Sequence, residues 1–515
     1  MTQVGAQEAI VDSAAAEATL PSVSTKQVAS SAIWRATETA GTELVAFVVF
    51  TTLARLLAPE DFGAVALAGS IMTMLQGLLY HGFTEALIQK PDVGEAHHRT
   101  VLATNLLFAT ALIVLGFLLA WPLGLLLGRG EFPTIFGALL PSLLLRGLSS
   151  PMLASLRRDL DFRAIALRTL LGVCVGGALA VMLARHGAGY WALVVQQWSA
   201  ELVGFLVLIR ASPTKPWRLH FDRAVLRELL PVALPVMGAA FLSVAARRLD
   251  TVALGIFLPN AVVGIYFMVY RLVFAAQMVT QHGLSEVAMV VLSSISQDRE
   301  RYRRGVLRAL RLMSYVCACA FGLLSAAGPW LVPLVFGSRW QDATEPLRVL
   351  AALSLGGAVV SIAGVTLVAS GYAAAFSRLS VGAAVAQLIA VAVAARWGLM
   401  AVVWSVGIAQ CLAIIPALRM LSRHYDVSWR DLVSELAPIV LFFVAGLLAA
   451  QWTSTLGTAW YMQPVASLVF CAVMAVAAWP LVRRERAERR ANAAEQSARH
   501  AQSTADAPAE TPLAT

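Results

Sequence analysis

The chain has 515 residues, of which 59% are hydrophobic and 13% are charged. A soluble protein carries about 25% charged residues, so the composition excludes an ordinary soluble domain. The net charge is +9 at pH 7. The basic residues are spread over short loops between apolar segments, and nothing in the sequence supports nucleic-acid binding.

The N-terminal segment, residues 1–29, is rich in alanine, serine and threonine and carries several acidic residues. It lacks the basic start and the apolar stretch of a secretory signal peptide. Because a segment with so few large apolar residues cannot build a core, we expect a disordered cytoplasmic tail.

Apolar segments of about 20 residues or more follow along most of the chain, and each can span the hydrocarbon core of a bilayer. They do not alternate polar and apolar residues, as the strands of a membrane barrel do. The sequence therefore predicts an all-α polytopic membrane protein with about 14 transmembrane helices. The predicted spans are residues 30–57, 62–88, 101–121, 134–156, 165–184, 189–209, 229–257, 261–292, 312–336, 346–370, 377–395, 398–418, 434–451 and 461–482.

The loops between these spans differ in charge. On the side of the two termini, 21 lysines and arginines lie in loops and helix ends, whereas the opposite side has 6. The positive-inside rule places the richer side, with both termini, in the cytoplasm. The orientation of the protein in the membrane thus accounts for the basic residues of these loops, and contact with anionic head groups would be their second role. The residues of the opposite side are Arg55, Arg129, Arg185, Arg339, Arg348 and Arg396.

Two heptapeptides that lie 201 residues apart are near copies, because HGFTEAL begins at His81 and HGLSEVA begins at His282. Further matches occur in order, with offsets between 200 and 211. A run of matches at a nearly constant offset indicates an internal duplication. The other matching pairs are Pro59 and Pro259, Gly63 and Gly264, Arg168 and Arg378, Gly172 and Gly382, Arg185 and Arg396, and Gly187 and Gly398.

The duplication predicts how the domains are organised. Each repeat has an even number of spans, so both enter the membrane in the same orientation and the symmetry axis runs along the membrane normal. The predicted domains are an N-lobe of six helices at 30–210, a cytoplasmic linker at 211–228, a C-lobe of six helices at 229–425, two additional helices at 426–482 and a disordered cytoplasmic tail at 483–515.

The sequence has no Walker motif for a nucleotide, and its five cysteines are not spaced as a zinc site. We therefore expect neither a cofactor nor a metal. The driving force is then an ion gradient, the substrate gradient or consumption of the product.

Several motifs together resemble the Wzx-type polysaccharide flippases, which are polysaccharide transporters of the MOP superfamily. The resemblance covers most of the predicted N-lobe and C-lobe. Its motifs are LARLLAPEDFGAVALA at 53–68, HGFTEALIQK at 81–90, RRDLDFRAIA at 157–166, GAGYWALVVQQ at 187–197, RRLDTVALGIFLPNAVVGIYFMVYRL at 247–272 and VFGSRWQDATEPLRVLA at 335–351.

The resemblance implies a multi-pass transporter of the bacterial cytoplasmic (inner) membrane rather than an enzyme. Its substrate would be an undecaprenyl-pyrophosphate-linked oligosaccharide, a polyprenyl-linked repeat unit that is moved by alternating access between two lobes. The product would enter exopolysaccharide, capsule or O-antigen assembly. Membrane lipids, a polysaccharide polymerase and export proteins would be its partners.

Two other functions stay open. A cation-coupled drug or metabolite antiporter of the same superfamily would need an unpaired acidic site, and intramembrane arginines count against it. A membrane polysaccharide polymerase or ligase would carry a large extracytoplasmic loop with catalytic residues, whereas the loops between the predicted spans are short.

Five arginines within predicted spans are the candidate substrate-binding residues. An arginine at a helix centre costs about 2.5–3.5 kcal/mol on insertion scales, so each should face a cavity or a partner. Planar guanidinium groups bind pyrophosphate through charge-assisted hydrogen bonds. Local ion pairing is the alternative, since Arg247 and Asp250 share a helix face. The five are Arg35, Arg146, Arg247, Arg248 and Arg271.

The two histidine motifs are candidates for a gate or an ion-coupling site. His81 and Glu85 lie on one helix face because they are four residues apart, as do His282 and Glu286. Histidine titrates near neutral pH, so these residues, with Asp250, could respond to protons. Hydrogen bonding at helix ends, copied by the duplication, is the alternative.

Overall fold

The computed structural model describes residues 25–90, 92–212, 219–295, 298–425, 427–456 and 461–480, together with Arg483 and Arg486. All regular structure in these residues is helical. Fourteen helical stretches within them are long and apolar enough to cross a membrane, so the predicted all-α polytopic fold is confirmed. The chain forms two compact units, Met1–Gly264 and Ile265–Thr515.

Short-range sequence signals set the helix boundaries of the first unit. Pro59 occupies the first turn of α3, where its missing N–H is not needed. Asp161 and Asp222 accept hydrogen bonds from the backbone N–H groups of Ala164 (3.1 Å) and Ala224 (2.8 Å) and so cap α7 and α9. The helices are α2 (Thr25–Leu56), α3 (Pro59–Gln89), α4 (Glu95–Leu126), α5 (Phe132–Leu139), α6 (Ser142–Arg158), α7 (Phe162–Arg185), α8 (Trp191–Ala211) and α9 (Arg223–Phe257).

The fourth predicted span, 134–156, is not one continuous helix. It consists of α5 and α6, which are separated at Leu140 and Pro141. Proline has no N–H and its ring clashes with the preceding turn, so a helix is interrupted there. The shorter helix α6 then packs against α3, α4 and α8.

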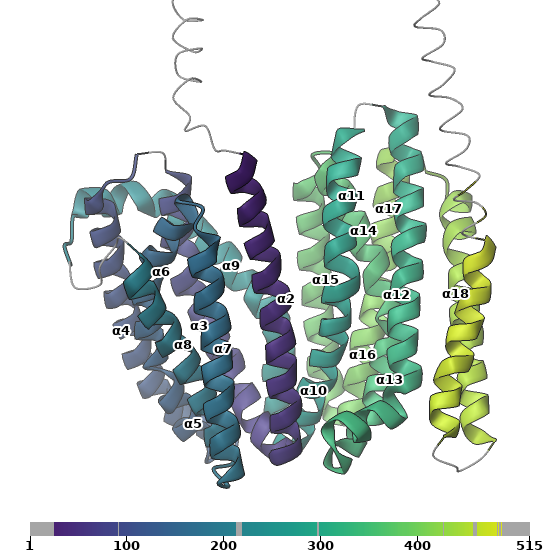
Figure 1. Ribbon diagram of the computed structural model, residues 1–515, viewed down its shortest axis with the longest axis horizontal. Helices are drawn as coiled ribbons and strands as arrows, with labels where there is room; N and C mark the ends of the chain where they lie inside the picture. The colour runs from purple at the N-terminus through teal and green to yellow at the C-terminus, as the bar shows by residue number, and fades with distance from the viewer. Residues whose placement is uncertain are drawn as a thin grey trace, which may run out of the picture. The chain divides into compact units, whose positions relative to one another are not determined.

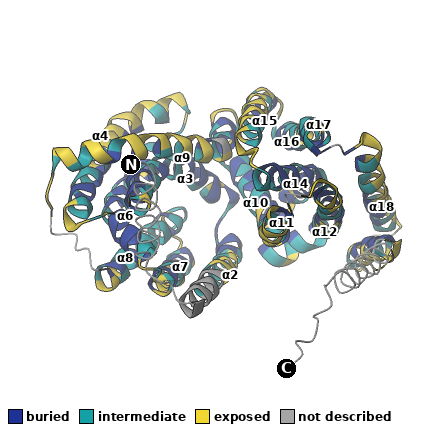
Figure 2. Cartoon of the chain, turned by 90° about the horizontal axis from the view of Figure 1, so that it is seen from above, coloured by how far each residue is buried: buried dark blue, intermediate teal, exposed yellow. Residues whose placement is uncertain are grey.

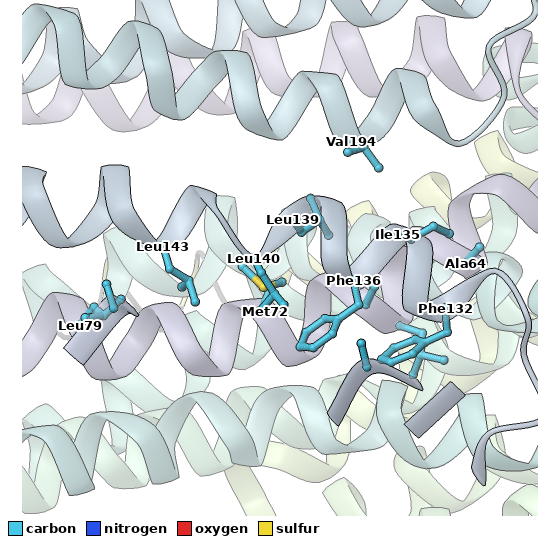
Figure 3. Packing of buried hydrophobic residues seen from close by; sticks show 14 residues of the cluster. Ala64, Met72, Leu79, Phe132, Ile135, Phe136, Leu139, Leu140, Leu143 and Val194 are labelled. Carbon is cyan, nitrogen blue, oxygen red and sulfur yellow. The ribbon is translucent and has the colours of Figure 1, made fainter. Parts of the chain in front are cut away.

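Helix α3 is central to the packing of this unit, because it contacts α4, α5, α6, α8 and α9 (Figure 1). Its residues Met72 and Leu79 are buried in one cluster with Phe136, Leu140 and Leu143 (Figure 3). By contrast, α4 leaves many apolar side chains exposed (Figure 2). Such a surface is unfavourable in water and is suited to contact with lipid tails.

The starts of α3 and of α10 (Asn260–Gln277) approach each other at two glycines that the duplication pairs. A Cβ atom on Gly63 would lie 1.8 Å from the carbonyl oxygen of Asn260, and one on Gly264 would lie 1.9 Å from that of Pro59. The two backbones are in direct contact, so only glycine fits at either position. This reciprocity is expected if a twofold axis relates the repeats, and the duplication itself stays a prediction.

Arg129, in the turn between α4 and α5, fastens the end of α9 and the start of α10. Its guanidinium donates to the carbonyl oxygens of Gly255 (3.1 and 3.2 Å) and Leu258 and to the side chain of Asn260. These bonds satisfy carbonyl groups that a helix C-terminus leaves without partners. Partial burial lowers the pKa of the guanidinium, which nevertheless stays protonated.

The second unit begins within α10. A π-helical turn, Met278–His282, follows α10 and leads into α11, so the eighth span is irregular at the second histidine motif. The tenth and twelfth spans are divided at Ser354 and Ala413. The remaining helices are α11 (Gly283–Ser294), α12 (Arg299–Phe336), α13 (Thr344–Leu353), α14 (Leu355–Ala369), α15 (Ala373–Ala394), α16 (Leu399–Leu412), α17 (Ile414–Tyr425), α18 (Trp429–Thr455) and a last helix, Met462–Pro480.

Helix α12 is the packing centre of this unit, because it contacts α13, α14 and α18. At Gly322, a Cβ atom would meet the rings of Phe470 (2.0 Å) and Phe443 (2.9 Å), which come from the last helix and from α18. The two helices predicted to lie outside the repeat are therefore packed onto α12.

Packing divides the chain between Gly264 and Ile265, beyond the predicted linker at 211–228. Helix α9 begins at Arg223, inside the predicted linker, and it packs against α3 within the first unit. A unit defined by packing need not end where a duplicated segment ends, so the lobe boundaries stay predictions. Residues 1–24 and almost all of the predicted tail at 483–515 lie outside the described residues.

Candidate functional site

Ionic and aromatic side chains from four helices of the first unit meet in the interior of its bundle. They come from α3, α6, α7 and α8, which pack against one another in the order α3–α6, α6–α8 and α7–α8. We call this group the arginine cluster. Its members are Gln76, Tyr80, His81, Glu85, Arg146, Arg157, Arg168 and Glu201.

Glu201 is at the deep end of the arginine cluster. It lies at the midpoint of α8, about 15 Å along the helix from either end at 1.5 Å per residue. Its carboxylate oxygens lie 3.3 Å from Nη2 of Arg146 and 3.7 Å from Nη2 of Arg168. Nη2 of Arg146 also lies 3.5 Å from the amide oxygen of Gln76. Two guanidinium groups thus lie beside one carboxylate in the interior of the unit.

Tyr80 connects this deep part to the end of α6. The guanidinium groups of Arg146 and Arg157 lie over its ring, at 5.6 and 5.2 Å from the centroid, which is the geometry of a cation–π contact. Arg157 also donates to the Tyr80 hydroxyl and lies 3.4 Å from Glu85. Glu85 in turn lies 3.9 Å from Nδ1 of His81.

Positive charge exceeds negative charge in the arginine cluster. Its three arginines face two carboxylates; within electrostatic range, Arg247 of α9 adds a positive charge near His81, and Glu38 of α2 adds a negative charge near Arg168. Three of its buried donor atoms have no hydrogen-bond partner among the described residues: Gln76 Nε2, Arg146 Nε and Arg168 Nε. Buried donors are rarely left without a partner, so these are available to an acceptor such as water or an anion.

Exposure increases from the deep end of the arginine cluster toward the histidine. The side chain of Arg168 is 12% exposed and that of Arg146 is 23% exposed, whereas that of His81 is 41% exposed. Arg247, on the neighbouring α9, is exposed as well. An anion could therefore contact His81 and Arg247 first and the deeper guanidinium groups afterwards.

The structure brings four of the predicted site residues into or beside this cluster, namely Arg146, His81, Glu85 and Arg247. Arg247 donates to the Ser243 hydroxyl (2.9 Å).

The other predicted residues are distributed over both units. On α9, Arg248 is half-buried, while Asp250 is buried and accepts a hydrogen bond from the backbone N–H of Thr251 (2.6 Å). In the second unit, Arg271 of α10 is half-buried and Glu286 of α11 is exposed. The side chains of Arg35 and His282 lie outside the described part of the structure, so their predicted roles stay predictions.

Sequence reasoning missed five members of the cluster, namely Gln76, Tyr80, Arg157, Arg168 and Glu201. Arg168 falls within the predicted span 165–184 but near its cytoplasmic end, so the sequence suggested only a role in topology; in the structure it lies within α7, which begins at Phe162, and pairs with Glu201. Arg157, one residue beyond the predicted span 134–156, lies at the end of α6, and its side chain donates to the hydroxyl of Tyr80 on α3. Asp161 is a good N-cap residue, so the sequence could have placed the helix start at Phe162 and Arg168 well inside the helix. No signal in the sequence marks Tyr80.

A family model matches the chain over residues 52–345 and describes a polysaccharide biosynthesis protein. This match covers more than half of the chain. The chain belongs to this family. The matched residues include the whole arginine cluster, so the cluster lies in the part of the chain that the family shares.

Two relatives with curated descriptions fit this assignment. The succinoglycan biosynthesis transport protein ExoT of Rhizobium meliloti (strain 1021) is 29% identical over 336 residues, which cover 64% of this chain and 67% of ExoT. The lipopolysaccharide biosynthesis protein WzxC of Escherichia coli (strain K12) is 22% identical over 331 residues, which cover 63% of this chain and 66% of WzxC. The alignments thus span about two thirds of each relative.

Among solved structures, the chain is similar to the lipid II flippase MurJ in an inward closed conformation. The TM-score is 0.71 and the sequence identity is 12%, over 87% of this chain and 98% of MurJ. At this identity the likeness concerns the fold alone: the helices of this family member are arranged as in MurJ.

Proposed function

We propose that this protein is a flippase for undecaprenyl-pyrophosphate-linked oligosaccharide repeat units. It moves them from the inner to the outer leaflet of the cytoplasmic membrane by alternating access between two lobes. The units then enter exopolysaccharide, capsule or O-antigen assembly, with a polymerase and export proteins acting downstream.

The arginine cluster is the observation that carries the proposal. A pyrophosphate is a compact polyanion, and guanidinium groups bind phosphate oxygens through charge-assisted hydrogen bonds. Arg146 and Arg168 each have a buried Nε donor that no atom in the described part of the chain accepts from, so they can bind an anion while their other nitrogens stay near Glu201. A cationic drug would instead be repelled by an excess of positive charge, which argues against the antiporter alternative.

The deep position of the cluster suits a transport step. A charged head group that crosses the bilayer must exchange water for other polar partners, because unpaired charge in hydrocarbon costs several kcal/mol (about 2.5–3.5 on insertion scales for arginine). His81 and Arg247 receive the head group near the exposed end, and Arg146 and Arg168 offer donors at the level of Glu201. His81, Glu85, Asp250, His282 and Glu286 are the residues we propose for gating or ion coupling.

The names of the relatives support the substrate class. ExoT is described as a transport protein of succinoglycan biosynthesis, and MurJ is described as a flippase for lipid II. The charge asymmetry of the loops favours an orientation with both termini in the cytoplasm.

Deletion of the gene in its host separates the three candidate functions. For a flippase, polysaccharide export stops and complete lipid-linked repeat units accumulate in the inner leaflet, where a membrane-impermeant reagent added to spheroplasts cannot reach them. Expression of the wild-type chain restores export.

The other functions predict different results in the same strain. If repeat units accumulate in the outer leaflet, the chain acts after flipping, as a polymerase or ligase would. If export is unchanged and only drug sensitivity rises, the chain is an antiporter. Either result contradicts the proposal.

A further inference from the structure

A second feature, separate from the arginine cluster, is a pocket in the second unit. Its volume is about 770 Å³, and it lies between α11, α12 and α14, with one contribution from α18. Val287, Val291, Leu292, Leu312 and Ile362 are among the residues that give it a largely apolar wall. A pocket of this size can hold a lipid segment or a small ligand.

The lining also carries four arginines but only one glutamate. Arg311 is buried and pairs with Glu435 of α18 at 3.4 Å, so these two charges largely cancel. Arg301 and Arg304 are exposed at the start of α12. Their nearest carboxylates are also exposed, with Asp298 at 3.5 Å and Glu300 at 3.8 Å. Pairs of this kind are screened by water and exchange easily, so both guanidinium groups can accept another anion.

The polar and apolar parts of the pocket are arranged along α12. From Arg301 to Met313 the helix rises about 18 Å, at 1.5 Å per residue. This length runs from one membrane surface to about the middle of a bilayer, whose hydrocarbon core is roughly 30 Å thick. Such a pocket matches an amphiphile with an anionic head group and an alkyl chain.

We propose that this pocket binds an anionic phospholipid of the cytoplasmic leaflet, with its phosphate at Arg301 and Arg304 and an acyl chain along the apolar wall. Charge complementarity argues for this occupant, because the start of α12 lies on the side with most basic residues and the cytoplasmic leaflet is the negatively charged one. Val287 and Val291 line the pocket and are largely exposed, so a bilayer lipid can reach it from the side. The inference does not depend on the transported substrate.

The test uses the purified full-length protein in nanodiscs of phosphatidylcholine with increasing fractions of phosphatidylglycerol. Native mass spectrometry counts the phosphatidylglycerol molecules that stay bound after release from the disc. We expect saturable retention by the wild type, with no equivalent retention of phosphatidylcholine. The variant Arg301→Gln/Arg304→Gln should bind phosphatidylglycerol at least about tenfold more weakly, since each basic residue at the surface contributes to the attraction.

A matched control and a second variant separate the pocket from general surface charge. Arg419→Gln/Arg423→Gln removes the same charge from two exposed residues of α17, outside the pocket, and should retain phosphatidylglycerol as the wild type does. Ala288→Phe keeps every arginine but fills the apolar wall, and it should also weaken retention.

Parallel nanodiscs also contain undecaprenyl phosphate. The inference is overturned if both double variants lose retention equally, if Ala288→Phe retains phosphatidylglycerol as the wild type does, or if undecaprenyl phosphate is retained in the pocket while phosphatidylglycerol is not. The first would mean that only net charge matters, and the last would assign the pocket to the transported lipid. A flippase that fails in transport but retains phosphatidylglycerol leaves this inference intact.

Discussion

At the scale of single residues, Arg146 is the most informative position. It lies near the middle of the fourth candidate span, Phe132–Arg158, contacts Glu201, Gln76 and Tyr80, and keeps one donor without a partner among the described residues. A hydrogen bond to a charged group contributes roughly 1.5–3 kcal/mol. We therefore expect Arg146→Ala to reduce polysaccharide export by at least about tenfold at unchanged protein abundance. Arg146→Lys should restore export only in part, because lysine lacks the planar fork.

A second variant distinguishes substrate binding by Arg146 from a purely structural ion pair. Arg168 also lies 3.7 Å from Glu201, so Arg146→Gln leaves one guanidinium group beside that carboxylate. If Arg146 only neutralises Glu201, Arg146→Gln should therefore export normally, whereas we expect it to lose export as Arg146→Ala does. Arg185→Ala, at the exposed end of α7, is the control and should export normally. Normal export by Arg146→Gln would show that the arginine is structural.

Individual residues also show how far the sequence could predict the site. Arg146 was predicted because an arginine inside an apolar span carries a high insertion cost, whereas His81 and Glu85 were predicted from the duplicated motif and their spacing of four residues. Their grouping with Arg157, Arg168 and Tyr80 could not be predicted, because it depends on which faces of α3, α6 and α7 meet. Long arginine side chains also reach several ångströms from the position that the sequence assigns to them.

At the scale of helices, the contact between α3 and α10 leads to a stability prediction. Gly63→Ala places a Cβ atom 1.8 Å from the carbonyl oxygen of Asn260, so the two helix starts must separate. Overpacking of this kind costs about 1–3 kcal/mol or more. We expect a lower melting temperature of the purified protein in detergent, measured by intrinsic fluorescence.

The matched control for this variant is in the same helix. Gly69 has no atom within 4 Å of a Cβ position, so Gly69→Ala should leave stability unchanged or raise it by about 0.5–1 kcal/mol. Equal melting temperatures for Gly63→Ala and Gly69→Ala would show that the close approach of α3 and α10 does not exist in the protein in solution.

Helix positions were predictable, whereas helix irregularities were not. Apolar length alone locates the 14 spans, because a bilayer requires a nearly fixed number of apolar residues. Pro141 interrupts the fourth span, but Pro231 and Pro235 lie inside the continuous helix α9. Neighbouring helices and side chains can satisfy the backbone groups that a proline frees, so proline alone does not decide where a membrane helix breaks.

At the scale of the whole molecule, the charge asymmetry of the loops predicts a topology. Because 21 basic residues lie on one side and 6 on the other, both termini and the segment after Ser212 should be cytoplasmic. Fusions of alkaline phosphatase after Ser212 and at the C-terminus should be inactive, whereas fusions of a green fluorescent protein there should fluoresce. Phosphatase activity at either position would reverse the orientation.

The fold and the family of the molecule were predictable from the sequence because they rest on features that repeat along the chain. Composition and span length predict a polytopic helical membrane protein, and the motifs at 53–68 and 81–90 predict a polysaccharide family; the 14 candidate spans and the family match confirm these two predictions. The oligosaccharide was not predictable, since sugar specificity depends on a few contacts within a fold that many substrates share.

The central claim is that this chain flips a pyrophosphate-linked oligosaccharide, and reconstitution tests it most directly. Purified protein is placed in liposomes that contain a fluorescent undecaprenyl-pyrophosphate oligosaccharide in both leaflets, and a membrane-impermeant quencher is added outside. We predict that wild-type protein makes the inner-leaflet molecules accessible, whereas Arg146→Ala/Arg168→Ala and protein-free liposomes leave them protected. If the inner-leaflet molecules stay protected with folded wild-type protein, under an imposed ion gradient as well as without one, the proposed function is wrong.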